Sequence, residues 1–253
     1  MPAHYDDPSF SYTQYWQGRQ YEHESEVLAI QTLFSRLHFN SLADVGGGYG
    51  RLIPTLSQYS SQLSLIEPSK KQRQIATKIL NSLPGITVLA GTAENTRLPA
   101  ASQDAVVLVR VIHHLPYPGP AFLEAARILR PGGYLLLEFA NSANFKARLV
   151  NLVSGRPIPP LPLEKRSSQN IRARSIPFVN HHPQAIQALL TRHGFIQLRR
   201  LSVSNFRHPL LKKIFSSKIL LVLESLSQSW LSSLWFGPSI FILARRLDNQ
   251  RTL

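Results

Sequence analysis

A glycine-rich sequence, DVGGGYG, occupies residues 44–50 and is the first candidate for chemistry in this chain. It follows a short apolar run, predicted as a strand, and precedes a predicted helix. Glycines at such a turn let the backbone bend tightly and approach a ligand, while the N–H groups at the start of the helix face that ligand. Tight strand-to-helix turns without a ligand use glycine too, so a second feature is needed to indicate a binding site.

The glycine spacing and the next carboxylate favour one kind of nucleotide. Gly46, Gly48 and Gly50 form a GxGxG pattern, whereas the dinucleotide fingerprint GxGxxG would need its third glycine at Arg51. This spacing disfavours NAD. Glu67 ends the second predicted strand, where a carboxylate can accept both hydrogen bonds of a ribose diol. The alternative for Glu67 is a carboxylate at the surface end of a strand.

These residues are positioned by a regular alternation of apolar runs and helical segments, which predicts an α/β domain with a mostly parallel sheet. Seven strands are predicted, at residues 41–45, 63–67, 86–91, 105–109, 134–139, 195–203 and 239–246. Helices are predicted at residues 51–59, 69–82, 119–129, 183–193 and 210–226, and an amphipathic helix at 21–37 precedes the sheet.

The chain is predicted to divide into residues 1–38, an N-terminal cap made of an aromatic segment and a helix, and residues 39–253, the main domain. Within the main domain, residues 141–182 are predicted as a basic lid or loop, because residues 155–183 hold six prolines and five Lys/Arg and lack apolar periodicity. Residues 207–236 are predicted as a helical insertion before the last strand.

The order of these motifs resembles the class I S-adenosylmethionine-dependent methyltransferases, in particular the small-molecule enzymes related to the quinone-biosynthesis methyltransferases. The segments GTAENTRLPAASQDAVVLVRVIHHL (91–115) and ILRPGGYLLLEF (128–139) are similar to that family's third- to fifth-strand region, and HPQAIQALLTRHGF (182–195) to the helix and turn before its sixth strand. The resemblance covers residues 21–195, and the final strand matches more loosely. It implies a seven-stranded Rossmann-like sheet and S-adenosyl-L-methionine as the cofactor.

The resemblance also implies which residues bind the methionine and ribose parts of the cofactor. By it, Asp44, Gly46 and Gly48 face the methionine part, and Glu67 binds the ribose hydroxyls. Arg110, after the fourth predicted strand, offers its backbone near the methionine amino group.

On the adenine side, the resemblance places Pro68 near the ring, with Ala93 and Glu94 beside it. Thr92 departs from the family pattern, because the family usually has an acidic residue there that contacts the adenine amino group. Glu94 is the candidate to replace that contact.

The segment YWQGRQYEHESE, residues 15–26, looks like the N-terminal cap of some relatives. In that arrangement Tyr15 or Arg19 would close over the cofactor, since a guanidinium suits a carboxylate such as that of the methionine part. Ordinary packing of Tyr15 and Trp16 is the alternative interpretation.

Methyl transfer from a sulfonium is an in-line displacement that removes cationic charge, so alignment in a dry pocket can carry much of the catalysis. Where an acceptor must lose a proton, His114, with His113 as second candidate, follows the fourth strand and could take it. Packing or shaping the pocket is the alternative for both. His181 and His182 could reach the site from the lid, and no spacing in this chain, which lacks cysteine, indicates a metal site.

The net charge of +14 is unevenly distributed. Residues 1–100 carry eight Lys/Arg and eight Asp/Glu, whereas residues 151–253 carry fifteen and three. This asymmetry predicts an anionic partner for the C-terminal part, namely a nucleic acid, a phospholipid surface or an acidic substrate, or else a solvated basic surface. With neither a secretory signal nor a transmembrane helix predicted, we expect a cytoplasmic protein that can contact a membrane peripherally through its basic C-terminal half.

The expected function is methyl transfer to a small, apolar or lipid-like metabolite. In the predicted helix 210–226, Lys212, Lys213 and Lys218 flank an apolar face, which could rest on a membrane, pack into the core or form a dimer contact. One alternative is a nucleic-acid methyltransferase that uses the basic C-terminal half, although RVIHHL lacks the Pro-Pro-aromatic motif of adenine amino methylation and no cysteine is present for attack on cytosine. The other is a non-catalytic module that binds the cofactor.

Overall fold

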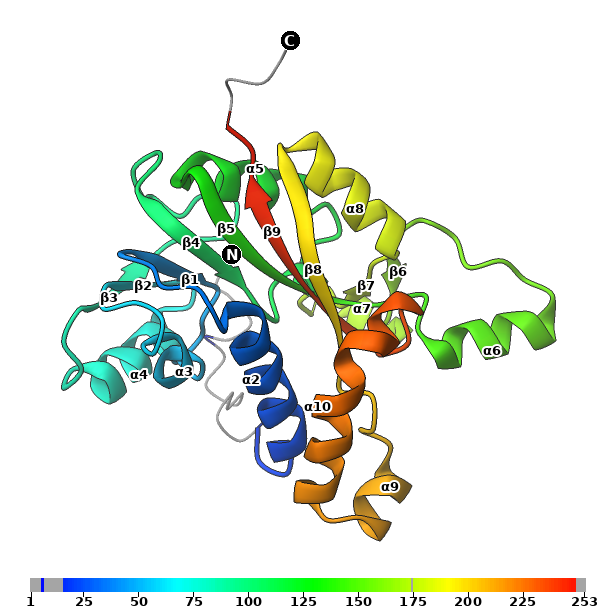
Figure 1. Ribbon diagram of the computed structural model, residues 1–253. Helices are drawn as coiled ribbons and strands as arrows, with labels where there is room; N and C mark the ends of the chain where they lie inside the picture. Colours follow the sequence, from blue (N-terminus) through cyan, green and yellow to red (C-terminus); the bar gives the residue numbers. More distant parts are fainter. Residues whose placement is uncertain (1–5, 7–15, 174, 249–253) are drawn as a thin grey trace.

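The computed structural model describes residues 6, 16–173 and 175–248. One sheet of seven strands runs through the molecule in the order β3-β2-β1-β4-β5-β9-β8 (Figure 1). Strands β1 to β5 of this sheet pair in parallel, and β9 is antiparallel to both β5 and β8. The predicted seven-stranded, mostly parallel sheet is confirmed.

The strands of the sheet are β1 (Leu42–Val45), β2 (Leu63–Glu67), β3 (Ile86–Ala90), β4 (Gln103–Leu108), β5 (Leu129–Ala140), β8 (Phe195–Val203) and β9 (Ser239–Arg246). A separate two-stranded pair consists of β6 (Leu163–Glu164) and β7 (Val179–Asn180). The helices are α2 (Gln20–Phe34), α3 (Ile53–Leu56), α4 (Lys70–Leu80), η2 (Ile112–His114), α5 (Gly119–Ile128), α6 (Phe145–Ser154), α7 (Ser168–Arg172), α8 (Pro183–Arg192), α9 (Pro209–Ile214) and α10 (Ser217–Ser233).

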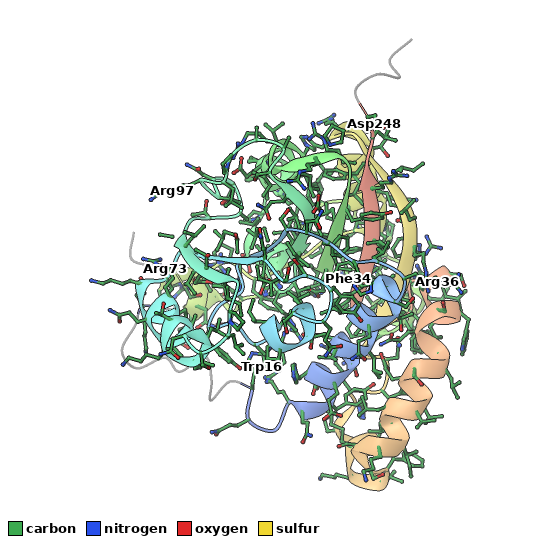
Figure 2. The ribbon with its side chains drawn as sticks, turned by 60° about the vertical axis from the view of Figure 1, so that its left-hand side comes forward. Trp16, Phe34, Arg36, Arg73, Arg97 and Asp248 are labelled. Atoms are coloured by element: carbon green, nitrogen blue, oxygen red, sulfur yellow. The ribbon has the colours of Figure 1, made fainter. Side chains whose placement is uncertain are left out.

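Helices cover both faces of the sheet, because successive strand residues point to opposite sides and each side is apolar. On one face, Phe122 of α5 and Ile186 of α8 pack into a core with β4 and β5. On the other, Phe34 of α2, Ile53 of α3 and Leu80 of α4 pack against β1 and β2, with Phe34 fully buried (Figure 2). The helix of the predicted cap, α2, therefore shares a core with the rest of the domain.

Strand β5 begins at Leu129, five residues before the predicted start. Leu129 pairs with Gln103 of β4, the chain then bulges through Arg130–Gly133, and regular pairing resumes between Tyr134 and Ala105. The sequence RPGG, which follows the predicted helix 119–129, forms a bulge between two paired parts of one strand.

The prediction of a single helix at residues 210–226 is wrong. Phe215 is extended, with φ of −111° and ψ of 142°, and it ends α9, while the Ser216 side chain caps α10 by accepting a hydrogen bond from the Ile219 N–H. Short helices and strands, α6, β6, α7 and β7, also occupy the segment predicted as a basic lid or loop. Among the described residues, no helix is long and apolar enough to cross a membrane.

Candidate functional site

A cavity lies at the carboxyl ends of β1, β2 and β4, beside the point where the strand order reverses between β1 and β4. Open α/β sheets bind ligands at such switch points, because the loops that follow the two strands diverge there. Its volume is about 850 Å³, with the open mouth included, and it is lined by Gly46, Gly48, Glu67, Pro68, Gln72, Thr92, Ala93, Glu94, Arg110, Val111, His114, Leu115 and Ile176. Eight of the residues predicted to bind a cofactor are therefore brought together here.

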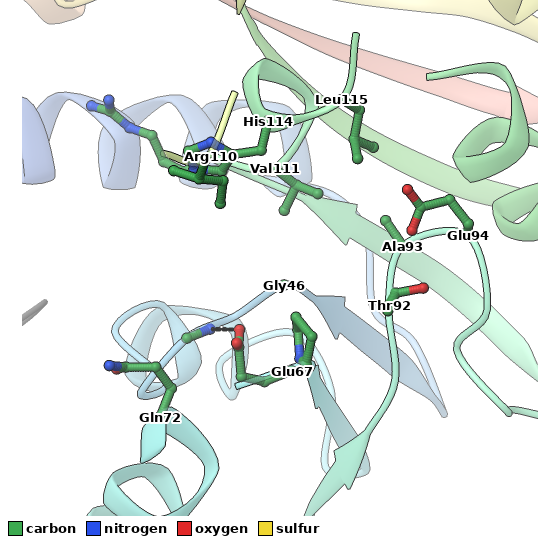
Figure 3. Close-up of a pocket in the computed structure, with 13 residues that line it drawn as sticks. Gly46, Glu67, Gln72, Thr92, Ala93, Glu94, Arg110, Val111, His114 and Leu115 are labelled. Atoms are coloured by element: carbon green, nitrogen blue, oxygen red, sulfur yellow. Dashed lines mark hydrogen bonds between the residues drawn. The ribbon is translucent and has the colours of Figure 1, made fainter. Parts of the chain in front are cut away.

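The glycine loop after β1 forms the floor of this cavity (Figure 3). Gly46 and Gly48 have φ angles of +76° and +60°, which favour glycine. A Cβ atom at Gly46 would collide with the Val111 side chain, so the loop packs directly against the segment that follows β4. A backbone this close to the cavity can present its N–H groups to a ligand.

Glu67 points its carboxylate at the glycine loop from the end of β2 (Figure 3). One oxygen accepts the Gly48 N–H at 3.0 Å, and the other accepts the Ser69 N–H at 2.8 Å. Burial raises the pKa of this carboxyl, although the two backbone donors oppose the shift. Each carboxylate oxygen can accept a further hydrogen bond, so Glu67 can receive two hydroxyl donors from a ligand in the cavity.

Gln72, in the first turn of α4, lines the same cavity and was missed by the sequence analysis. Its side chain is 1% exposed, and neither the amide oxygen nor the amide nitrogen has a hydrogen-bond partner among the described residues. A buried amide without partners costs about 1–3 kcal/mol, so a ligand that supplies a donor and an acceptor at this position would relieve the penalty. A glutamine in the predicted helix 69–82 gives no signal of this role.

The loop after β3 forms the opposite wall, and it carries Thr92, Ala93 and Glu94 (Figure 3). Thr92 closes this loop on Asn95, since its backbone N–H donates to the Asn95 carbonyl at 3.0 Å and its hydroxyl accepts the Asn95 N–H at 3.2 Å. Glu94 is exposed at the mouth. The wall therefore has a carboxylate at position 94 and a hydroxyl at position 92.

Arg110 follows β4 in a left-handed conformation, with φ of +64°. Its N–H donates to the buried carboxylate of Glu138 at 2.9 Å, and its guanidinium leaves the cavity to pair with Glu26 of α2 at 2.6 Å (Figure 3). This conformation costs a non-glycine residue about 1–3 kcal/mol, and the two carboxylates hold it in place. Arg110 thus offers the cavity its backbone.

Glu26 is the centre of a buried ion pair that the sequence analysis also missed. It is fully buried and binds both Arg110 and Arg51, the latter at 2.6 Å, while Trp16 stacks on the Arg51 guanidinium at 3.8 Å. Burial by itself would raise the pKa of Glu26, but the two arginines prevail and hold the pKa below its ordinary value. This cluster ties α2 to the glycine loop and to the segment after β4.

Asp44 lies beneath the glycine loop and does not line the cavity. It is buried, one carboxylate oxygen has no partner among the described residues, and burial raises its pKa to about 7. The predicted contact of Asp44 with the methionine part stays a prediction, and any contact needs an approach through the loop.

Of the two candidate histidines, His114 lines the cavity and His113 does not. The Nδ1 atom of His114 lies 2.8 Å from the Pro177 carbonyl oxygen, which places the ring proton on Nδ1 and makes Nε2 the basic nitrogen. His113 is buried behind it against Phe178, and burial lowers its pKa well below the ordinary value. His114 therefore has the better position for a proton acceptor.

The other predicted site residues lie outside the cavity or outside the described residues. His181 is buried with Nε2 3.1 Å from the Ile112 carbonyl oxygen, and His182 caps α8. Arg19 is exposed at the N-terminus of α2, and Tyr15 falls outside the described residues. Within residues 6, 16–173 and 175–248, no group of three or more His, Cys, Asp or Glu side chains could hold a metal ion.

Comparison with known proteins finds a family that matches the part of the chain around the glycine loop. Residues 43–137, from β1 through most of β5, match a family described as "Methyltransferase domain". The match includes the glycine loop, Glu67, the loop after β3 and both candidate histidines.

One curated relative is the phthiotriol/phenolphthiotriol dimycocerosates methyltransferase 1 of Mycobacterium ulcerans, which is 32% identical over 113 residues. That alignment covers 45% of this chain and 40% of the relative, so the chain spans well under two thirds of the length of the relative. The sequence similarity is therefore limited to the aligned part of each protein.

Solved structures share the fold over nearly the whole chain. An S-adenosylmethionine-dependent methyltransferase from Thermotoga maritima superposes with a TM-score of 0.65 at 21% identity, covering 96% of this chain and 98% of that one. Another, from Mesorhizobium loti, has a TM-score of 0.62 at 17% identity and covers 88% and 98%. These likenesses extend the shared architecture to β8 and β9, beyond the matched domain.

Proposed function

We propose that this protein, which carries a methyltransferase domain on the class I S-adenosylmethionine-dependent methyltransferase fold, transfers a methyl group to a small, apolar or lipid-like metabolite. The observation that carries the proposal is the buried Glu67 carboxylate, which lies against the Gly46–Gly48 loop at the switch point of the sheet. S-adenosylmethionine is the cofactor that the family and fold imply. Its ribose diol matches the two acceptor oxygens of Glu67.

The remaining lining residues fit the rest of that cofactor. Pro68, Thr92 and Ala93 offer a mostly apolar slot beside Glu67 for the adenine, with Glu94 at the mouth. The Gly46–Gly48 backbone and that of Arg110 lie on the other side, where the methionine part would bind. The unpartnered amide of Gln72 adds a donor and an acceptor next to Glu67. Tyr15 and Arg19 stay candidates for closing over the cofactor.

When bound, the cofactor supplies a methyl group on a sulfonium, so the C–S bond breaks as the bond from the methyl carbon to the acceptor forms, and the electron pair stays on sulfur. The chain contributes alignment of the acceptor in a largely apolar cavity, where Val111, Leu115 and Ile176 exclude water. His114, held through Nδ1 by Pro177, can take the acceptor proton on Nε2. His113 would act only by packing against His114.

The apolar lining favours an acceptor with an apolar part. A mycobacterial relative is named for methylating phthiotriol and phenolphthiotriol dimycocerosates, and this supports an acceptor of lipid-like character for the present chain. A cytoplasmic enzyme would meet such an acceptor at a membrane surface.

The first test is calorimetric binding of S-adenosylmethionine and S-adenosylhomocysteine, with NAD as a control ligand. We expect micromolar-range binding of the first two, lost in Glu67→Ala and in Gly48→Val and retained in Glu24→Ala, a partly exposed carboxylate on α2 that does not line the cavity. No binding by the wild-type chain, or a preference for NAD, would refute the proposal.

Acceptor screening then separates the remaining functions. Methyl transfer to apolar alcohols, phenols or acidic carbons supports the proposal. Binding of RNA that weakens with salt, together with methylation of that RNA, would favour a nucleic-acid methyltransferase instead. Cofactor binding without transfer to a broad panel would favour a non-catalytic module.

A further inference from the structure

Helix α10 has an unusual distribution of polar and apolar residues. Its buried face mixes two leucines with polar residues, namely Leu220, Glu224, Ser227, Gln228, Leu231 and Ser232. Its exposed face carries a stripe of large apolar side chains at helical spacing, namely Ile219, Val222, Leu223, Leu226, Trp230 and Leu234. Leu226 is 71% exposed and Trp230 is 60% exposed. A helix that only packs on its own domain turns its apolar stripe inward, so the outer stripe of α10 requires another explanation.

The inner face of α10 is fixed by specific hydrogen bonds of its polar residues, so rotation of α10 cannot bury the stripe. Glu224 accepts the Tyr21 hydroxyl at 2.7 Å and the Ser204 N–H at 2.7 Å. Gln228 donates to the Ser25 carbonyl of α2 at 3.0 Å. Turning α10 about its axis would leave this buried carboxylate without its donors.

Helix α6 is a second element with exposed apolar side chains. It has no buried residue, and its large apolar side chains Phe145, Leu149, Val150, Leu152 and Val153 are all exposed. Leu152 and Val153, at the far end of the helix, are 81% and 83% exposed. Figure 1 shows α6 projecting from the body of the molecule with sheet and helices on one side only.

The two elements come together where α6 begins and α10 ends. Phe145 at the start of α6 stacks on Phe236, which follows α10, with ring centroids 4.9 Å apart. A hollow beside α6 is lined by Lys146 of that helix, Lys165 of the lid and Arg207, which directly precedes the cap of α9. We name the exposed side chains of α6, α9 and α10 the docking face.

The charge of the docking face is one-sided. Residues 141–163 and 207–236 contain seven Lys/Arg and one acidic residue, Glu224, whose carboxylate is buried. The basic residues are Lys146, Arg148, Arg156, Arg207, Lys212, Lys213 and Lys218. Lys212 is paired with Glu22 of α2 at 2.5 Å. Exposed apolar side chains flanked by an excess of Lys and Arg match the acyl chains and phosphate groups of an anionic bilayer surface.

We propose that the docking face binds the surface of an anionic phospholipid bilayer, with the apolar side chains of α6 and α10 among the acyl chains and the basic residues at the phosphates. Helix α6 follows β5 at the edge of the sheet where the cavity opens, and the lid after it contributes Ile176 to the cavity. Docking therefore holds the cavity near the bilayer. Docking does not depend on methyl transfer, whereas delivery of a lipid-like acceptor from the bilayer rests on the proposed function.

The experiment is cosedimentation of the full chain with vesicles of phosphatidylcholine alone and of phosphatidylcholine mixed with phosphatidylglycerol. We expect binding to the mixed vesicles that weakens with salt, and little binding to phosphatidylcholine alone. The pairs Leu152→Ser with Val153→Ser and Leu226→Ser with Trp230→Ser should each reduce the partition coefficient about tenfold or more. The matched control is Leu123→Ser on α5, 61% exposed and distant from the docking face, which should leave binding unchanged.

Charge and insertion are measured separately. Replacing Lys213 and Lys218 by Gln should weaken binding to the mixed vesicles about fivefold for each lysine removed. Wild-type tryptophan emission should shift to shorter wavelength on vesicle binding. Trp230→Phe should remove most of the shift, because the other two tryptophans, Trp16 and Trp235, are only partly exposed.

Calorimetric binding of S-adenosylmethionine and thermal unfolding check that each serine variant is folded, and vesicle binding requires no cofactor. Failure of docking is thus distinguishable from failure of the proposed function. No binding to mixed vesicles overturns the proposal, as does binding that the lysine variants abolish while both serine pairs leave it intact. Concentration-dependent dimers that the serine pairs dissociate, without vesicle binding, would assign the face to a second copy of the chain and also overturn it.

Discussion

Replacing Glu67 by Gln tests the centre of the site with the smallest change in shape. The carboxylate holds the Gly48 and Ser69 N–H groups at 3.0 and 2.8 Å and keeps one acceptor position on each oxygen for a ligand. An amide retains one acceptor oxygen and turns a donor toward one of these N–H groups. The ligand therefore loses charge assistance in both hydrogen bonds, and one of them altogether.

The magnitude follows from the strength of hydrogen bonds to charged groups, about 1.5–3 kcal/mol each. Losing one such bond and weakening the other should reduce the binding free energy of S-adenosylmethionine by about 3 kcal/mol. This raises its Kd about a hundredfold. Calorimetric titration at pH 8 measures it, with Glu24→Gln, a partly exposed position on α2 outside the cavity, as the matched control. A Kd for Glu67→Gln within threefold of the wild-type value would refute this account of Glu67.

The same pair of proteins gives a pH test. Burial raises the pKa of Glu67 in the free protein, and hydroxyl donors from the ligand favour the ionised form. Affinity should therefore be highest above this raised pKa and fall as the pH drops through it, because the carboxyl must lose its proton to bind. Glu67→Gln has no such proton, and its affinity should be independent of pH over that range.

Three further predictions concern buried groups around the site. Glu26→Gln leaves two partly buried arginines without their carboxylate and should lower the free energy of unfolding in urea by about 3–5 kcal/mol; a loss under 1 kcal/mol would contradict this role. Asp44→Asn should make the free protein more stable than the wild type at pH 8, where the buried carboxyl with a pKa of about 7 is ionised, and this gain should shrink as the pH falls toward 4; a constant difference across that range would argue against the burial penalty. Gln72→Leu removes two unpartnered amide atoms, so thermal unfolding of the free protein should be unchanged or later while the Kd of S-adenosylmethionine rises about tenfold; equal affinity would remove Gln72 from the cofactor site.

Much of the site could be predicted because its residues follow local patterns. The glycine loop and Glu67 each lie at the end of a strand. The length and apolar composition of each run identify those strands without knowledge of which strands they pair with. Parallel strands then bring their carboxyl ends to one edge, so Gly46, Gly48, Glu67 and the loop at Thr92 meet in one cavity. The order of motifs along the chain was sufficient for this part.

Contacts between segments far apart in the sequence could not be predicted in the same way. Glu26 meets Arg51 and Arg110 across 25 and 84 residues, and none of the three has a local pattern that reports the pairing. The unpartnered amide of Gln72 depends on which side of α4 faces the cavity. The choice between His113 and His114 was decided by the turn at η2, which buries one ring and exposes the other to the cavity.

By itself the sequence determined the parallel sheet, its order of elements and the residues at the strand ends, because these depend on local periodicity and turn chemistry. Only the tertiary structure decided which side of each helix is buried. The apolar residues of 210–226 left open whether their stripe packs into the core, rests on a membrane or forms a dimer contact, but the break at Phe215 and the hydrogen bonds of Glu224 leave the stripe of α10 outside. Hydrogen bonds around one buried carboxylate thus set the rotation of α10, with Leu220 and Leu231 as the apolar side chains buried beside it, and no local pattern in the sequence encodes those contacts.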